Sequence, residues 1–320
     1  MGINAAGSGL GGLIYSLAVG AIIPRLGLSW AFRILGIVAC AVNVICANLL
    51  RDRNTAVGSR FKAFHFPLLK RSEFILFLGW GIFTMLGYVA LLFSIANFAL
   101  SVGLSAHQSS IISALLNLGQ GLGRPFVGMF SDKLGRINIA SFLSFLCGLF
   151  CLLIWTFARS MGLVSFFAVL VGTVAGTYWA TVAPVLAEII GLKDLPCGLS
   201  ITWLVLVAPT TVAEPIALIL RDNNSENRVY LDVQLFTGLV YIAAAVCLWI
   251  VRGWKVGEDT RLKQESSAGH VDQKEDGAVF QQPDEAGNNR NMNHSQQSAR
   301  AALWYPHTLI RRMVAIKKKV

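Results

Sequence analysis

Charged residues are scarce: they make up 14% of this 320-residue sequence, against about 25% in an ordinary soluble domain. Hydrophobic residues make up 55%, and the mean hydropathy is +0.60. This composition excludes a soluble globular enzyme, a disordered protein and a fibrous repeat. The apolar residues come in blocks of about 20, enough for a helix to cross a bilayer, and the alternation typical of a membrane β-barrel is missing. The sequence predicts an all-α membrane protein.

Residues that carry catalysis or bind metals are also few, with five histidines and six cysteines in the whole sequence. Cys147 and Cys151 share a helix face, but no histidine or carboxylate accompanies them, so we expect small apolar core residues and no metal site. The H-E-x-x-H, G-x-S-x-G and P-loop motifs are absent, as is the pattern of a signal peptide. We therefore expect neither an enzyme nor a cofactor.

The apolar blocks predict eight membrane-spanning helices. Their approximate ranges are about 4–23, 29–50, 73–99, 107–130, 138–157, 161–189, 197–220 and 232–252. Basic residues gather in 51–72, in 131–137 and just after the last span, and the positive-inside rule places these segments and both termini in the cytoplasm. The net charge of +10 then reflects topology and not binding of nucleic acid. The expected partner is a lipid bilayer, with the plasma membrane favoured over vacuolar or other internal membranes.

The segment 253–320 predicts a basic cytoplasmic tail. Residues 256–300 are polar and too poor in apolar side chains to form a core, so disorder is expected there. The end, from Trp304 and Tyr305 to Lys319, mixes apolar and basic residues. It could be an interfacial helix on anionic lipid, an unstructured basic tail or a gene-model read-through, and the sequence leaves these alternatives open.

The fourth predicted span carries a charged residue inside an apolar helix, Arg124. A charge at this depth costs about 2.5–3.5 kcal/mol on insertion scales and usually faces a cavity or a partner. Asn117 and Gln120 precede it at i, i+3, i+7 spacing, so the three project from one face. A guanidinium can bind a carboxylate with two hydrogen bonds, which favours a substrate site. The alternatives are a structural ion pair and an arginine that reaches the membrane surface.

Glycines flank this face and also fill the first span. Close helix packing explains such spacing, because small residues let two backbones approach. The positions are Gly119, Gly121 and Gly123 in the fourth span and Gly7, Gly9, Gly11 and Gly12 in the first.

Several further residues are candidates for transport or gating. A charged loop at helix ends can pair in one conformation and release in another, with plain positive-inside charge as the alternative. Tyr178, Trp179, Thr181 and Trp203 could line the substrate site, although bundle aromatics more often form the core. Glu188 is expected at a solvated helix end. Glu214, beside Pro215, could act as a proton or gating site or lie at the outer interface. The gating loop comprises Gly128, Asp132, Lys133, Gly135 and Arg136.

These motifs resemble a known family. The loop Gly128-x-x-x-Asp132-Lys133-x-Gly135-Arg136 resembles the cytoplasmic loop signature of the major facilitator superfamily. Gly-Arg124-Pro125 resembles the monocarboxylate-porter branch in its fungal form. So do Gly-Ser-Gly-Leu-Gly-Gly with Pro24-Arg25-Leu-Gly27 and Trp30-Ala-Phe-Arg33, and so does the stretch from Trp179 to Glu214-Pro215. The likeness covers residues 1 to about 252.

The resemblance implies alternating-access transport of a small carboxylate, by proton symport or facilitated diffusion. Arg124 matches the family arginine that pairs with the substrate carboxylate. Proton-coupled members carry an acid four residues before it, where this sequence has Gln120.

The resemblance also implies a domain organisation. Residues 1–50 correspond to the last two helices of an N-terminal six-helix half, 51–72 to the linker and 73–252 to the C-terminal half. A twelve-helix carrier would need four further helices upstream, so an N-terminal truncation is expected. The alternative function is a truncated or regulatory fragment without transport activity; a chain that acts as it stands would have to self-associate.

Overall fold

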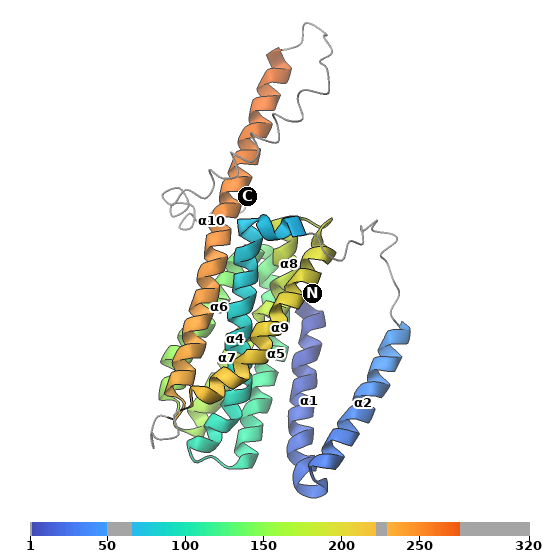
Figure 1. Cartoon of the computed structure of the whole chain (residues 1–320), viewed down its shortest axis with the longest axis vertical. Coiled ribbons are helices and arrows are strands. Elements are labelled where there is room, and N and C mark those ends of the chain that lie inside the picture. Colours follow the sequence, from blue (N-terminus) through green and yellow to red (C-terminus); the bar gives the residue numbers. More distant parts are fainter. Residues whose placement is uncertain (1, 50–65, 222–228, 276–320) are drawn as a thin grey trace. The chain divides into compact units, whose positions relative to one another are not determined.

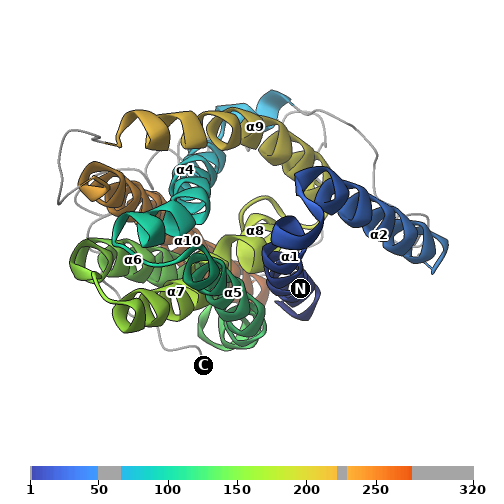
Figure 2. The same ribbon diagram turned by 90° about the horizontal axis from the view of Figure 1, so that it is seen from below.

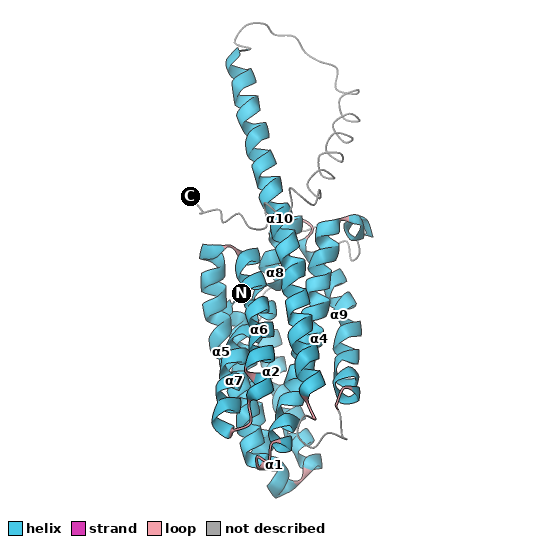
Figure 3. Cartoon of the chain, turned by 90° about the vertical axis from the view of Figure 1, so that its left-hand side faces the viewer, coloured by secondary structure: helices cyan, strands magenta, loops and turns pink. Residues whose placement is uncertain are grey.

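The computed structural model describes residues 2–49, 66–221 and 229–275, and the chain divides into two compact units, 1–247 and 248–320. The part of the chain that is described is helical and contains no strand, as predicted (Figure 3). The α-helices are α1 (Gly2–Leu26), α2 (Leu28–Leu49), α4 (Ser72–Ser101), α5 (Ala106–Leu134), α6 (Arg136–Leu153), α7 (Met161–Ala175), α8 (Thr177–Ile190), α9 (Leu195–Ile219) and α10 (Leu231–Glu275). Short 3₁₀ helices lie at η1 (Phe66–Lys70) and η2 (Trp155–Phe157).

Within 2–49, 66–221 and 229–275, seven segments are long and apolar enough to cross a membrane. They are Ala6–Leu26, Leu28–Leu49, Ser72–Ser101, Arg136–Phe157, Met161–Ile190, Leu195–Ile219 and Leu231–Arg261. The remaining predicted span is α5, which is 29 residues long. At 1.5 Å per residue it reaches about 43 Å, so its length suffices. Its polar side chains, the ones singled out above, lower its hydropathy below that of the other seven.

The span expected at 161–189 is two helices, because the helix is interrupted at Gly176. Glycine is a poor helix former. A Cβ atom at this position would lie 2.7 Å from Nε of Arg124. The interruption thus occurs where a side chain on α5 needs space.

Successive spans of unit 1–247, with α7 and α8 counted as one, run in alternating directions (Figure 1). The end of α4 meets the start of α5, where Ser109 Oγ donates to the Ala96 carbonyl at 2.7 Å. The 3₁₀ helix η2, which follows α6, meets the start of α10, where Gln234 Nε2 donates to the Trp155 carbonyl at 3.2 Å. In the view from below, α1 lies beside α5 and α8 (Figure 2).

Glycines permit the closest helix crossings. A Cβ at Gly9 of α1 would overlap the backbone of Gly121 on α5, and one at Gly123 would overlap the backbone of Thr173 on α7. Gly119 likewise faces α7, so the predicted packing role is confirmed for these positions and for Gly12, which faces Asn117. The predicted packing role is wrong for Gly7 and Gly11, because a Cβ atom at either position would have no neighbour within 4 Å.

Aromatic residues fill the core between α4, η2, α7 and the start of α10. The Trp155 ring stacks 5.5 Å from Phe167, and Phe98 lies 5.9 Å from both Trp155 and Tyr230. The outward surface is also apolar; Ile37 on α2 and Phe157, for example, are 70% and 72% exposed. Exposed apolar side chains over whole helices are what a bilayer covers.

The last helix continues past the predicted end at residue 252 and runs to Glu275. The expectation of disorder is therefore wrong for residues 256–275. Lys255 pairs with Glu258 at 3.2 Å and with Asp259 at 3.6 Å, and such i, i+3 and i, i+4 pairs together with good helix formers extend a polar helix. The expectations for 276–320 and for linker residues 51–65 fall outside the described residues.

Candidate functional site

Arg124 lies in the interior of α5 and is 2% exposed. Its guanidinium donates to Ser8 Oγ on α1 and, at 2.6 Å, to Oε1 of Gln120 one turn earlier on α5. The alternative in which this side chain reaches the membrane surface is therefore wrong. Burial of the charge instead creates a polar point inside the apolar bundle, between α1 and α5.

Gln120 is as deeply buried as Arg124, at 2% exposed. Its Oε1 accepts two hydrogen bonds, from Arg124 and from the Tyr88 hydroxyl of α4 at 3.0 Å. Its Nε2 has no hydrogen-bond partner among the described residues. A buried N–H donor without a hydrogen-bond acceptor destabilises a structure by about 1–3 kcal/mol. The cluster therefore has more donors than acceptors.

Asn117 lies on the same face of α5, as its spacing predicts. Its Nδ2 donates to Ser16 Oγ of α1 at 3.2 Å and to the Ser113 carbonyl at 2.9 Å. The polar face of α5 thus meets two serines of α1, Ser8 and Ser16. Sequence reasoning missed both, although two hydroxyls eight residues apart in an apolar span were a usable signal.

The interruption between α7 and α8 completes the surroundings of Arg124. Gly176 faces the guanidinium and its stem, and Gly123 brings α5 against Thr173. The C-terminal end of α7, which carries a partial negative charge, therefore lies beside Arg124. That charge stabilises the positive guanidinium in its buried position.

The predicted aromatic residues lie on α8 and α9. Tyr178 is buried, with its ring 4.7 Å from Trp80 of α4. Trp179 and Trp203 stack at 5.7 Å with an interplanar angle of 17°. Trp179 also meets the Tyr88 ring at 6.3 Å, edge to face. Tyr88, which the sequence did not single out, therefore links the aromatic residues to Gln120.

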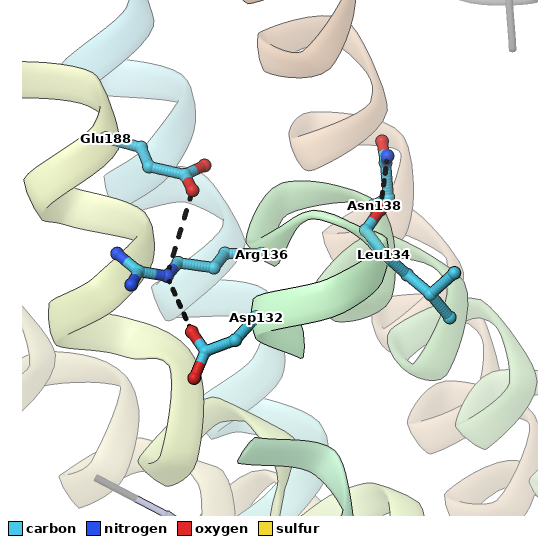
Figure 4. A network of polar contacts seen from close by, with 5 residues as sticks. All are labelled: Asp132, Leu134, Arg136, Asn138 and Glu188. Atoms are coloured by element: carbon cyan, nitrogen blue, oxygen red, sulfur yellow. Dashed lines mark hydrogen bonds and ion pairs between the residues drawn. The ribbon is translucent and has the colours of Figure 1, made fainter. Parts of the chain in front are cut away.

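A second cluster lies at the turn between α5 and α6. Gly135 has φ +96°, a conformation that L side chains rarely adopt, and it lets α5 end and α6 begin within one residue. Nε of Arg136 lies 3.2 Å from Oδ1 of Asp132 and 3.8 Å from Oε1 of Glu188 on α8 (Figure 4). The cluster therefore ties the α5–α6 turn to α8.

Glu188 lies near the end of α8 with its side chain 34% exposed, which agrees with the expected solvated helix end, and its carboxylate also pairs with Arg136. The other members of the predicted loop behave differently. Lys133 is exposed and Gly128 is half-buried. Neither takes part in the contacts drawn in Figure 4.

Each charge in this cluster sits at the unfavourable end of its own helix. Asp132 and Glu188 lie near the C-terminal ends of α5 and α8, and Arg136 is the first residue of α6. Helix dipoles favour the opposite placement by about 0.3–1 kcal/mol each. The three charges are therefore stabilised by one another and not by the partial charges at the ends of their own helices.

Glu214 is exposed on α9. It lies 11 residues after Trp203, which corresponds to about 16 Å along a helix. The structure does not bring it into the group around Arg124 and Gln120.

Comparison with known proteins identifies the family. A model of the Major Facilitator Superfamily matches residues 1–194, more than half of the chain. The chain belongs to the major facilitator superfamily. Together with the seven apolar spans, this membership makes the chain a multi-pass integral membrane protein of the superfamily.

Several curated fungal proteins are similar to this chain. "Probable transporter MCH2" of Saccharomyces cerevisiae is 32% identical over 81% of this chain and 56% of its own length. "Uncharacterized transporter ESBP6" of the same species is 30% identical over 80% of this chain and 40% of its own length. "MFS-type transporter 1" of Ophiocordyceps sp. is 28% identical over 82% of this chain and 58% of its own length. All three are named as transporters and not as enzymes.

The chain therefore spans about half the length of the curated relatives it matches.

Proposed function

We propose that this chain serves a secondary transporter that moves a small, monocarboxylate-like anion across a membrane by alternating access. The observation that carries the proposal is the buried pair of Arg124 and Gln120. The guanidinium supplies a positive charge, and Gln120 Nε2 supplies a donor that no described residue accepts.

A carboxylate has two oxygens that accept hydrogen bonds and one negative charge. Bound at this cluster, it would accept from the guanidinium and from Gln120 Nε2 at once, which is the charge-assisted geometry that binds anions most strongly. The low local dielectric strengthens the attraction. A neutral ligand could accept these hydrogen bonds but would leave the positive charge of Arg124 uncompensated.

The gate in this proposal is the contact of Arg136 with Asp132 and Glu188. The side chains of Arg136 and Glu188 are 36% and 34% exposed, so the pair is worth at most about 1 kcal/mol. A contact of this strength can hold α8 against the α5–α6 turn in one conformation and release it in the other.

Proton symport would have to use a group other than position 120, because an amide does not titrate. Glu214 is the candidate: it is a carboxylate on α9 between Ala213 and Pro215. Glu214→Gln would then abolish any acceleration of uptake at low pH. An unchanged pH profile would exclude this residue as the proton site.

The direct test is binding by the chain itself, reconstituted in lipid nanodiscs. Arg124→Lys should weaken propionate binding at least about tenfold, because an ammonium lacks the planar fork that can contact Ser8, Gln120 and the carboxylate at once. Arg159→Lys, an exposed arginine near the predicted outer end, is the matched control and should bind normally. Equal affinity of the Arg124→Lys protein and the unchanged chain would remove Arg124 from the substrate site.

The second candidate is a fragment that does not transport. Proteoliposomes separate the two functions. Uptake of labelled propionate supports the carrier, whereas propionate binding without uptake supports the fragment. We place both termini in the cytoplasm on the strength of the loop charges, and we propose the plasma membrane as the location.

A further inference from the structure

Three aromatic side chains form a continuous row across α4, α8 and α9, and we call Tyr88, Trp179 and Trp203 the aromatic row. Trp203 and Trp179 stack face to face at 5.7 Å. Trp179 meets Tyr88 edge to face at 6.3 Å. The row therefore joins three helices that are separate in sequence.

One end of the row is the anion cluster. The Tyr88 hydroxyl donates to Oε1 of Gln120, the same oxygen that accepts from Arg124. The ring of Tyr88 thus lies between the buried charge and the two indoles. Any ligand that binds the charge has this ring as its neighbour.

The two indoles are not part of the packed core. Trp179 is 37% and Trp203 is 43% exposed, whereas Trp80 and Trp155 of the same bundle are fully buried. A stacked indole pair with free surface offers a flat apolar platform, and aromatic rings bind each other in stacked or edge-to-face geometry. The row thus has a hydrogen-bonded polar end at Gln120 and an exposed apolar end at Trp179 and Trp203. These two ends are complementary to a ligand that has one polar end and one flat apolar end.

We propose that the preferred ligand is a flat aromatic monocarboxylate, with its carboxylate at Arg124 and Gln120 and its ring against Trp179 and Trp203. The proposal rests on the function proposed above and specifies its substrate class. The carboxylate and the ring of such a ligand must be joined by a spacer, because the Tyr88 ring separates the two ends of the site.

Four ligands of graded chemistry test this proposal by calorimetry on the chain in nanodiscs. They are 3-phenylpropionate, 3-cyclohexylpropionate, propionate and the neutral 3-phenylpropionamide. We expect 3-phenylpropionate to bind about threefold to tenfold more tightly than its cyclohexyl analogue, which has similar apolar area but cannot stack. Propionate should bind more weakly than both, and the amide weakest.

Variants of the row locate the effect. Trp203→Leu should reduce the preference for the phenyl over the cyclohexyl ligand to about one. Trp203→Phe keeps a flat ring and should retain part of the preference, even if the leucine variant folds poorly. Trp249→Leu removes a tryptophan of similar exposure, 44%, and should change nothing.

The outcomes separate this proposal from the function on which it rests. Equal affinity for the phenyl and cyclohexyl ligands, with both lost in Arg124→Lys, overturns the aromatic preference and keeps the anion site. Equal affinity for 3-phenylpropionate and its amide overturns the anion site and keeps the aromatic platform. Failure of all four ligands to bind overturns both, and the aromatic row is then a packing face.

Discussion

At the scale of single residues, Gln120 decides which hydrogen bonds the proposed site can offer to a ligand. Its oxygen is saturated by Arg124 and Tyr88, so only its amide N–H groups are left for a ligand. A glutamate here would instead pair with Arg124 and occupy the charge that we assign to the substrate. The resemblance to the monocarboxylate-porter branch draws attention to this position, since its proton-coupled members carry an acid there.

We expect Gln120→Glu to weaken propionate binding at neutral pH, because the new carboxylate competes for the guanidinium. Binding should recover as the pH falls and the carboxylate becomes protonated, whereas the unchanged chain should show no such recovery. Calorimetric titrations across a pH series measure this. Asn97→Asp adds a charge on the exposed surface of α4 and is the control. A flat pH profile for Gln120→Glu would contradict the assigned pairing.

At the scale of helices, the crossing of α1 and α5 holds the site together. Gly9 faces Gly121, Gly12 faces Asn117 and Gly20 faces Ser110, so the two helices run antiparallel. The serines that contact Arg124 and Asn117 come from the same face of α1. Small residues therefore set the distance at which those polar contacts form.

Gly9→Ala should destabilise the chain by about 1–3 kcal/mol, because the added methyl group overlaps the α5 backbone. Gly11→Ala is the matched control: its methyl group would have open space, and alanine raises helix propensity by about 0.5–1 kcal/mol. Thermal unfolding in detergent, followed by tryptophan fluorescence, compares the two. A lower melting temperature for Gly11→Ala than for Gly9→Ala would contradict the crossing.

The second contact between helices is the pair of Arg136 and Glu188. A double-mutant cycle with Arg136→Gln and Glu188→Gln should give a coupling of about 0.2–1 kcal/mol in thermal unfolding, as expected for a half-exposed pair. The control is a second cycle that combines Lys133→Gln with Glu188→Gln. Lys133→Gln removes a charge from the same loop, and this cycle should show no coupling. Additive effects of the Arg136 and Glu188 substitutions would remove this pair as a gate.

At the scale of the whole molecule, loop charge predicts the orientation in the membrane. Lys133→Cys should react with an impermeant maleimide only from the cytoplasmic side, and Arg159→Cys only from the opposite side. Both variants are made in a background that lacks the six native cysteines. Labelling of intact cells and of permeabilised cells distinguishes the two sides. The reverse pattern would contradict the proposed location of the termini.

The sequence alone determined the helical class and the approximate positions of the spans. Apolar blocks of bilayer length can satisfy their backbone only as helices, so composition and period are sufficient. It also predicted the polar face of Asn117, Gln120 and Arg124, since helical spacing is a local property. The loop motif was visible for the same reason, because its residues are contiguous.

Only the tertiary structure decided which residues meet across helices. Ser8, Tyr88 and Glu188 join Arg124, Gln120 and Arg136 from positions 32 to 116 residues apart in the chain. Local pattern carries no record of such distances. The interruption at Gly176 and the extension of α10 to Glu275 were also missed, because one depends on space beside Arg124 and the other on ion pairs within a polar helix. The residue types thus indicated the chemistry of this chain, and helix packing decided which of these residues meet in the proposed site.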